Sequence, residues 1–475
     1  MKNEPSHGRR LAGLAAALLL AGCASTQGIG PQATQRTPAV PGASTQAVTP
    51  VSAQWWHDFG DPQLDRLVEQ ALRDSPNLGV ARARLRRAQA ATESAGAARY
   101  PQVTGSLDVT RQRFSENSLY PPPLAGSIDN TGTLQANFSW ELDFFGKNQA
   151  ALQAALGSAR AAEADVAAAR VVLASNVART YFQLLHVQEQ LAVARRTLQQ
   201  REEQLKLVNQ RVGAGLDTTL EQRQSEGALP EARQQIEALE EQAQLTRNAL
   251  AALVASQDVP AAGQLPALAT LHGGTALPAL PADLLARRPD VDAARWRVEA
   301  ANQDVRVAQA QFYPNINLTA FLGLSTLGLG RLLDVGSTQW GVGPAVRLPI
   351  FDAGRLRANL TGRNADLDAA IESYNGAVLE AFHEAGDAMA SLRSLARQQV
   401  EQRQAEAAAE GAYDIAVQRY RAGLGTYLNV LSAENAVLAQ RRLGVDLAAR
   451  ALDARVALYR ALGGGYAADT AVAAH

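Results

Sequence analysis

Side chains that could carry out catalysis are few and scattered along the chain. None of the six histidines in the 475-residue sequence belongs to a His-Glu-x-x-His metal-binding pair. His383 precedes Glu384, but no second histidine lies one helical turn away, which is typical of a solvated helix surface. The sequence contains no phosphate-binding loop, dinucleotide fingerprint or Gly-x-Ser-x-Gly elbow. It therefore predicts a protein that is not an enzyme and has neither catalytic residues nor metal ligands.

Cys23 is the one cysteine of the sequence, so a disulfide framework and a cysteine-based zinc cluster are excluded. A positively charged start precedes an apolar segment at 11–20, which suits a secretory signal peptide and is too short to span a bilayer. The segment ends in Leu20-Ala21-Gly22-Cys23, which resembles a bacterial lipobox, where the cysteine becomes the new N-terminus and is acylated. Ala24, in place of aspartate, favours passage to the outer membrane. An ordinary signal peptide with an incidental cysteine is the alternative.

These features predict a lipoprotein signal peptide at 1–22 and an acylated flexible tether at 23–54. The tether is rich in Ser, Thr, Gln, Pro and Gly, a composition that buries little apolar surface. The covalent lipid on Cys23 is the only cofactor we expect. Lys and Arg number 45 and Asp and Glu 46, and this balance argues against a nucleic-acid partner.

The rest of the sequence is one unit written twice. Pro76 and Pro101 match Pro289 and Pro314 at one constant offset, and later matches differ from it only by a single length change. The period far exceeds that of solenoid repeats. We therefore predict a first repeat at 55–260, a linker at 261–282, a second repeat at 283–462 and a flexible tail at 463–475.

Each repeat contains one very long helix. Residues 147–210 include no proline and one glycine, and as a helix they would extend about 96 Å at 1.5 Å per residue. Residues 355–420 form the matching run. Apolar residues recur every seven positions, which indicates a coiled-coil seam: Leu184, Leu191, Leu198, Leu205 and Val212 in the first repeat, and Leu431, Leu438, Val445, Leu452 and Tyr459 in the last helix.

Each repeat also contains two segments in which apolar and polar residues alternate. In 133–144 the apolar members are Leu134, Ala136, Phe138, Trp140 and Leu142. The segments near 103–110, 316–324 and 340–350 behave similarly, the last interrupted by Pro344 and Pro349. Such strands either cross an outer membrane or form a half-buried soluble sheet packed on the helices. The lipoprotein address favours the membrane.

Four strands cannot form a membrane barrel alone, because single-chain barrels begin at eight strands and open edges do not persist in lipid. The chain must therefore oligomerise. Two copies would supply eight strands and three would supply 12. An eight-stranded barrel is filled by its own side chains, whereas a larger one leaves a lumen. The long helices favour the larger number.

The order and spacing of these elements resemble the TolC-like outer-membrane factor family, in its lipoprotein branch serving efflux pumps of the resistance-nodulation-division (RND) type. The residues that carry the resemblance are Trp56 to Leu64, Arg287 to Asp290, Leu348 to Arg355 and Gln418 to Gly423. The resemblance implies a mainly α protein with membrane β structure. Three chains would form a 12-stranded outer-membrane β-barrel, continued by a long periplasmic α-helical coiled-coil barrel.

The function implied by this resemblance is a passive exit duct for drugs or other small molecules in a tripartite efflux or type I secretion-like system. Its partners would be two further copies of the chain, a periplasmic adaptor (membrane fusion) protein, an inner-membrane RND-type pump and outer-membrane lipid. The location implied is the Gram-negative outer membrane, with a lipid anchor and an extension into the periplasm.

The resemblance also assigns roles to residues at two glycine turns that join long helices. These hairpin tips, which would contact the adaptor, include Arg211, Gly213 and Gly215 in the first repeat and Arg419, Gly423 and Gly425 in the second. Tyr420, Leu428 and Ser432 would form the periplasmic gate. Family members often have leucine and aspartate at the last two positions, so Ser432 argues against an acidic ring at that level. The alternative for Leu428 is an ordinary seam leucine.

Two other classes of protein share some of these features. A structural periplasmic coiled-coil lipoprotein would have water-soluble strands and no conductance. An adaptor would carry a lipoyl-like β domain between its hairpins, whereas the β segments here are isolated strand pairs.

Overall fold

The computed structural model describes residues 26–36, 51–117, 119–271 and 288–467, so the whole predicted signal peptide, Cys23 and parts of the predicted tether, linker and tail lie outside the described residues. The chain divides into two compact units. The first, here called the strand unit, contains Arg84–Ala162 and Ala293–Asn375 together with the N-terminal segment up to Arg36. The second, here called the hairpin unit, contains Thr37–Ala83, Glu163–Asp292 and Gly376–His475. Each unit draws on both predicted repeats, so the boundaries of compact structure cut across the boundaries of the duplication.

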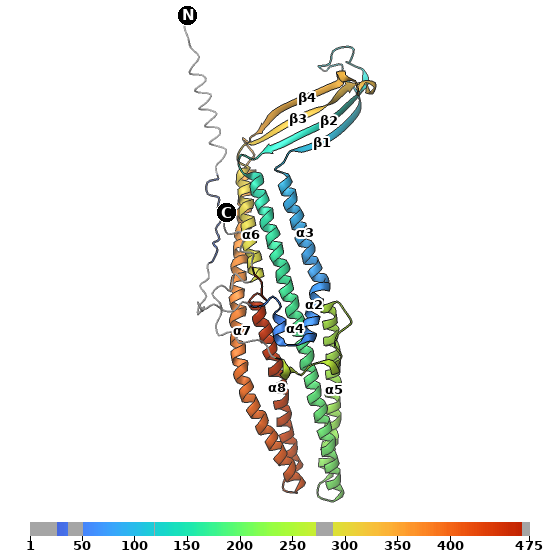
Figure 1. The fold of residues 1–475 in the computed structure, drawn as a ribbon, viewed down its shortest axis with the longest axis vertical. Coiled ribbons are helices and arrows are strands. Elements are labelled where there is room, and N and C mark those ends of the chain that lie inside the picture. Colours follow the sequence, from blue (N-terminus) through green and yellow to red (C-terminus); the bar gives the residue numbers. More distant parts are fainter. Residues whose placement is uncertain (1–25, 37–50, 118, 272–287, 468–475) are drawn as a thin grey trace. The chain divides into compact units, whose positions relative to one another are not determined.

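The strand unit carries one antiparallel sheet in the order β1-β2-β3-β4 (Figure 1). Its strands are β1 (Gln102–Arg113), β2 (Ile128–Leu142), β3 (Asn315–Leu327) and β4 (Thr338–Arg347). Two short turns of 3-10 helix, Leu329–Arg331 and Val335–Ser337, connect β3 to β4. β4 continues through Pro344, which lacks a backbone donor, because it is an edge strand of the sheet within one chain.

The alternating apolar residues lie in rows on one face of this sheet. Leu107 is opposite Leu134, which is opposite Leu324, and Leu322 is opposite Trp340. Trp340 is 72% exposed. The short 3-10 helix Leu329–Arg331 touches this face at Gly132, but no described α-helix covers it as a half-buried soluble sheet would require, so the exposed rows favour a lipid-facing sheet. None of the helices in the described part of the chain is both long enough and apolar enough to cross a membrane.

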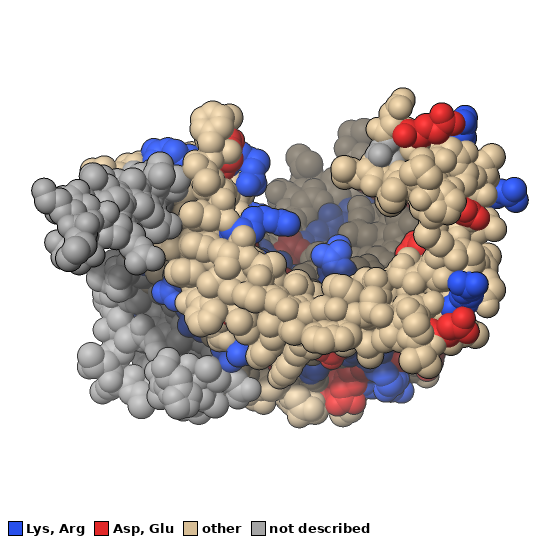
Figure 2. All heavy atoms as spheres, turned by 90° about the horizontal axis from the view of Figure 1, so that it is seen from above, with Lys and Arg blue, Asp and Glu red and all other residues tan. Residues whose placement is uncertain are grey.

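Seen from the end that carries the strands, most of the surface belongs to uncharged residues, with charged side chains scattered among them (Figure 2). The helical part of the strand unit has its own small core, in which Val298 and Val305 of α6 (Pro289–Ala310) pack against Leu360 and Leu367 of α7 (Arg355–Arg421). Gly157 of α4 (Lys147–Gly213) lies where an added Cβ would come within 3.2 Å of Ala300, so the close approach of α4 and α6 requires glycine there.

Residues 26–36 depart from the prediction of a flexible tether over 23–54. The backbone N–H groups of Gln32 and Ala33 both donate to Asp368 Oδ1 of α7 at 2.8 Å, and the N–H of Arg36 donates to Asn375 Oδ1 at 2.9 Å. Ile29 packs against the α6–α7 core. These contacts hold this part of the predicted tether along α7, because two carboxamide or carboxylate side chains satisfy backbone donors that would otherwise face water.

The hairpin unit contains the C-terminal parts of α4 and α7. In the sequence, α5 (Thr219–Val254) follows α4, and α8 (Tyr427–Ala461) follows α7 (Figure 1). The composition of residues 64–99, rich in Ala, Arg, Leu and Gln, predicts one helix by propensity. The structure has two, α2 (Pro62–Asp74) and α3 (Pro76–Ala97), because Pro76 forces Ser75 into an extended conformation. Short 3-10 helices occupy Trp55–Phe59, Ala262–Gln264 and Leu268–Thr270.

The core of the hairpin unit is aromatic where α4 passes α2. Trp55, Phe59, Tyr181 and Phe182 are all buried, and the Tyr181 hydroxyl donates to Asp61, which also caps α2 by accepting from the N–H of Gln63. In the predicted seam of α4, Leu184 and Leu191 are buried, whereas Leu198 and Leu205 are half-buried. The predicted seam is therefore buried within one chain in its first half and only partly covered in its second.

Candidate functional site at the hairpin turns

Both predicted glycine turns close helical hairpins in the same way. The N–H of Leu216 donates to the carbonyl of Arg211 at 2.9 Å, and the N–H of Leu424 donates to the carbonyl of Arg419 at 2.8 Å. Gly215 and Gly423 have φ of 70° and 74°, a left-handed conformation that favours glycine. Gly213, the last residue of α4, and Gly425 have ordinary φ values. The Arg419 guanidinium donates to the carbonyl of Leu424 at 3.2 Å and closes its own turn.

Three side chains join the two turns to each other, and we call them the tip lock: Arg211, Asp217 and Tyr420. Arg211 Nε lies 2.8 Å from Asp217 Oδ2, and Arg211 Nη1 donates to the carbonyl of Tyr420 at 3.0 Å. The Tyr420 hydroxyl donates to the same oxygen of Asp217. The guanidinium also lies 4.5 Å from the centre of the Tyr420 ring, a cation–π contact.

The tip lock is well shielded from water within the chain. The side chains of Arg211 and Asp217 are 12% and 11% exposed, and Tyr420 is buried against Val208, Tyr427 and Val430. The hydrogen bond from Arg211 holds the pKa of the Asp217 carboxyl below its usual range. Burial and the neighbouring Asp217 carboxylate raise the pKa of the Tyr420 hydroxyl. At neutral pH the lock therefore contains an ionised carboxylate, a guanidinium and a protonated phenol, which all satisfy one another.

Asp217 is the member of this cluster that the sequence analysis missed. It stands two residues after Gly215, next to the capping box that Thr218 and Glu221 form at the start of α5. The available signal was a single acidic residue in the first turn, because Arg211 near the end of α4 and Arg419 near the end of α7 are both possible partners for it. The contact between Asp217 and Tyr420 could not be predicted from the sequence of either hairpin, because the two residues belong to different repeats.

A second buried polar link joins the same two hairpins further from their turns. Arg201 occupies a seam position of α4, and its Nε lies 3.2 Å from Glu434 Oε1 of α8. Its Nη1 donates to the carbonyl of Ala228 in α5 at 2.8 Å. The two charged side chains are only 10% and 5% exposed. Burial raises the pKa of Glu434 despite the nearby guanidinium.

Leu428 and Ser432 lie one turn apart and are both exposed, with Leu428 exposed by 65%. Their neighbours Tyr427, Val430 and Glu434 are buried on the opposite side of α8. Leu428 is therefore not part of the seam within one chain. Glu434 faces Arg201, so it does not share a face with Ser432 and cannot supply an acidic ring there.

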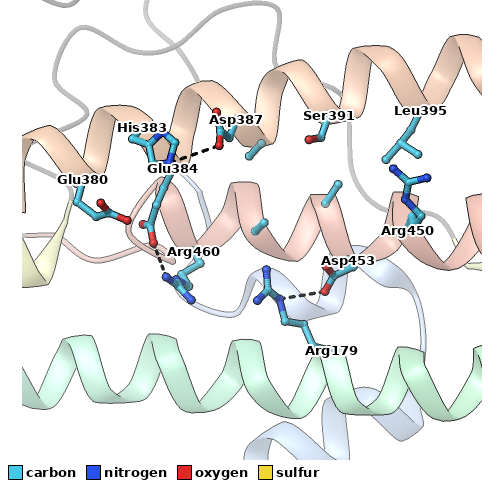
Figure 3. Close-up of a pocket in the computed structure, with 13 residues that line it drawn as sticks. Arg179, Glu380, His383, Glu384, Asp387, Ser391, Leu395, Arg450, Asp453 and Arg460 are labelled. Carbon is cyan, nitrogen blue, oxygen red and sulfur yellow. Dashed lines mark hydrogen bonds and ion pairs between the residues drawn. The ribbon is translucent and has the colours of Figure 1, made fainter.

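The charged residues higher in the hairpin unit pair across helices (Figure 3). Arg179 of α4 lies 3.0 Å from Asp453 of α8, and Arg460 of α8 contacts Glu384 of α7. His383, adjacent to Glu384 in sequence, lies 3.6 Å from Asp387 and is largely exposed. These contacts surround a cavity of about 380 Å³. In the described ranges, no three His, Cys, Asp or Glu side chains gather as metal ligands would.

A family model for outer membrane efflux proteins matches residues 67–256 and residues 280–464. The chain belongs to the outer membrane efflux protein family. The pyoverdine export outer membrane protein OpmQ of Pseudomonas aeruginosa is 36% identical over 420 residues, which cover 88% of each chain. The fusaric acid resistance protein FusA of Burkholderia cepacia is 41% identical over 371 residues, 75% of this chain and 69% of the other.

The crystal structure of the outer membrane protein VceC from Vibrio cholerae has the same fold. It matches with a TM-score of 0.81 at 38% identity and covers 87% of this chain and 99% of its own. The predicted fold class, that of trimeric TolC-like outer membrane channels, is therefore confirmed. The predictions of an efflux duct and of a place in the outer membrane with an extension into the periplasm are confirmed as well, and the predicted adaptor and pump are partners of this family. The lipid anchor stays a prediction.

Proposed function

We propose that the tip lock holds the periplasmic end of this efflux duct closed at rest. Arg211 and Asp217 belong to the α4–α5 hairpin, whereas Tyr420 ends α7, so the cluster fastens one hairpin to the other. Three copies of the lock, one in each chain of the trimer, would hold the inner hairpins together. This cross-hairpin cluster is the single observation that carries the proposal.

Leu428 and Ser432 form the constriction that the lock controls. Both side chains are free of contacts in the α8 seam, and three leucines at one level would make an apolar ring that excludes water and ions. Release of the lock lets the inner hairpins move apart and widens this ring. Ser432, one turn further, adds a neutral polar ring in place of an acidic one.

The exposed turn residues are the surface for the periplasmic adaptor. Gly213, Gly215, Gly423 and Arg419 are exposed there, whereas Gly425 and Arg211 belong to the same surface but are partly covered. Leu216 and Leu424, at the apices of the two turns, are 64% and 68% exposed and offer apolar contacts there. An adaptor that binds these turns competes with the lock for Arg211, which couples docking to opening.

The duct itself carries out no chemical reaction and takes its energy from an inner-membrane pump of the RND type. It has no cofactor, and a covalent lipid on Cys23 anchors it after removal of residues 1–22. The sequence repeats at 55–260 and 283–462, the linker at 261–282 and the tail at 463–475 complete this organisation. A scaffold lipoprotein without a channel is the competing function.

Single-channel recording on the purified, detergent-extracted protein separates these two functions. Reconstituted protein should give discrete steps of conductance with long closed periods, because the lock is intact without a partner. A control with detergent alone, without protein, should give no steps of conductance. Reconstituted trimers without any conductance, even after Tyr420→Phe, would identify the chain as a scaffold.

A further inference from the structure

A cavity of about 560 Å³ lies in the strand unit where β2 and β4 lead into α4 and α7, and we call it the junction pocket. Its lining includes Phe145, Lys147, Tyr313, Asn315, Arg347 and Arg355. Its volume falls in the range of about 300–1,000 Å³ that is usual for small-molecule sites. It shares no residue with the tip lock or with the constriction.

The strand register assigns the pocket to the polar face of the sheet. Asn315 is opposite Arg347, while the next residues, Ile316 and Val346, are paired on the apolar face. Since the apolar face meets lipid, the polar face meets the water inside the barrel. The junction pocket is therefore accessible to cargo in the duct, an inference that rests on the duct function proposed above.

The acidic groups around the pocket already have partners. Glu141 lies 2.5 Å from Lys147. Asp143 caps α4 by accepting from the N–H groups of Asn148 and Gln149. Asp352 caps α7 in the same way, through the N–H groups of Gly354 and Leu356.

The donors, in contrast, are not all paired. The guanidinium of Arg347 makes neither a hydrogen bond nor an ion pair within the described ranges. Arg355 has only a contact of 4.0 Å with Asp352 and is 69% exposed. Asn148 is 6% exposed, and its Nδ2 has no hydrogen-bond partner among the described residues. This imbalance favours an anion in the pocket.

One wall of the pocket is a pair of stacked aromatic rings. The rings of Phe145 and Tyr313 are nearly parallel, at 11°, with their centres 4.8 Å apart. They remain 45% and 46% exposed, so their free surface is available to a third flat group. A ligand with an aromatic ring and one negative charge would match both the rings and the unpaired guanidinium of Arg347.

We propose that the junction pocket is a transient binding site for small aromatic carboxylates that pass through the duct. The carboxylate would accept charge-assisted hydrogen bonds from Arg347, while the ring would contact Phe145 and Tyr313. One partly exposed ion pair and one ring contact suit a dissociation constant on the order of 1 mM, weak enough for release. Arg347 is thus a selectivity residue of the duct.

The test uses 2-naphthoate as the probe and 2-naphthalenemethanol, which lacks the charge, as its neutral analogue. Open trimers carrying Tyr420→Phe are recorded in bilayers while either probe is added at millimolar concentration. Naphthoate should reduce the conductance at a concentration at least about tenfold lower than the alcohol. Arg347→Ala should raise its half-blocking concentration about tenfold, whereas Arg363→Ala, which removes an exposed arginine of α7, should leave it unchanged.

Phe145→Leu provides a second variant, because it keeps the charge and removes part of the ring wall. It should reduce the preference for naphthoate over acetate. Binding is also measured without conductance, by titration of the naphthoate fluorescence with detergent-purified trimer. Equal binding by the wild type and Arg347→Ala would overturn the site, whereas absence of conductance with Arg347-dependent binding would overturn the duct and leave the site in place.

Discussion

The function of the hairpin turns depends on a few side chains whose neighbours can be named. Asp217 is the central residue, since it accepts from both the Arg211 guanidinium and the Tyr420 hydroxyl. One carboxylate thereby connects the α4–α5 hairpin to the end of α7. Removal of either donor leaves a shielded charge with fewer partners, which is costly in a site that excludes most water.

Leu428 offers the simplest test of the constriction. In Leu428→Ala a methyl group replaces the isobutyl side chain in each of the three chains, so the apolar ring widens and should exclude ions less well. We expect passive conductance to rise several-fold in reconstituted trimers. Leu443→Ala is the matched control, because Leu443 is also an exposed leucine of α8 but lies far from the turn. Equal conductance of Leu428→Ala and wild type would remove Leu428 from the gate.

Acid should also open the lock. The pKa of folded Asp217 lies below the ordinary value of 3.8, so the ionised form stabilises the lock above that pH and the stabilisation is lost as pH falls further. Open probability should therefore stay constant from pH 7 to about 4 and rise below pH 3.8. Recording across this range tests the prediction. Asp217→Asn should abolish the acid-dependent rise, and its persistence in that variant would exclude Asp217 as the cause.

At the scale of elements, the contact between α4 and α8 contains a buried ion pair where the heptad pattern calls for an apolar residue. Arg201 and Glu434 are both nearly inaccessible to water. A buried ion pair rarely makes a protein more stable than apolar residues in its place would. Removal of one partner, however, leaves the other charge buried without compensation, which is costly. The ion pair therefore sets the relative register of α4 and α8 and contributes little to the net stability of their contact.

Arg201→Met should destabilise the protein by about 3–5 kcal/mol, because Glu434 loses its countercharge. Arg201→Met combined with Glu434→Leu should recover most of that loss. Thermal unfolding in detergent, followed by circular dichroism, ranks the variants. Arg195→Ala, which breaks an exposed pair with Glu240, should change stability by less than about 1 kcal/mol. A double variant as unstable as Arg201→Met would contradict this role.

The sequence identifies these elements well and their mutual contacts poorly. Alternation over 133–144 and the seven-residue repeats are local patterns, so the strands and the long helices could be predicted. The break at Ser75 was missed because alanine- and arginine-rich composition outweighed one proline. Arg201 lies seven residues from both Ala194 and Val208 and interrupts the apolar row that they form beside the seam. Its role was missed because its partner Glu434 lies in the other repeat. Asp217 was missed for the same reason, and the attachment of residues 26–36 to α7 depends on Asp368, which has no sequence signal of its own.

At the scale of the whole molecule, one chain supplies a four-stranded sheet with two free edges, β1 and β4, and the trimer closes it. The apolar face of that sheet is a small part of the protein. Composition therefore averages to near-neutral charge and moderate hydrophobicity, although the protein resides in the outer membrane. We propose that Cys23, the single cysteine of the sequence, carries the lipid that anchors the chain to this membrane.

Cys23→Ser should abolish acylation and leave the trimer able to fold, because Cys23 precedes the attached segment at 26–36. Metabolic labelling with palmitate, followed by native electrophoresis, measures both properties. The wild type is expected to carry label and the variant none, with equal amounts of trimer. Labelled Cys23→Ser protein would contradict the lipobox assignment.

The most direct test of the central claim is the single-channel open probability of Tyr420→Phe against wild type at pH 7. This substitution removes one hydroxyl and keeps the buried ring, so it breaks the bond to Asp217 with little change in packing. The tip-lock account predicts long closed periods for wild type and an open probability at least about tenfold higher for the variant. The same open probability in both proteins would show that the cluster of Arg211, Asp217 and Tyr420 does not close the duct.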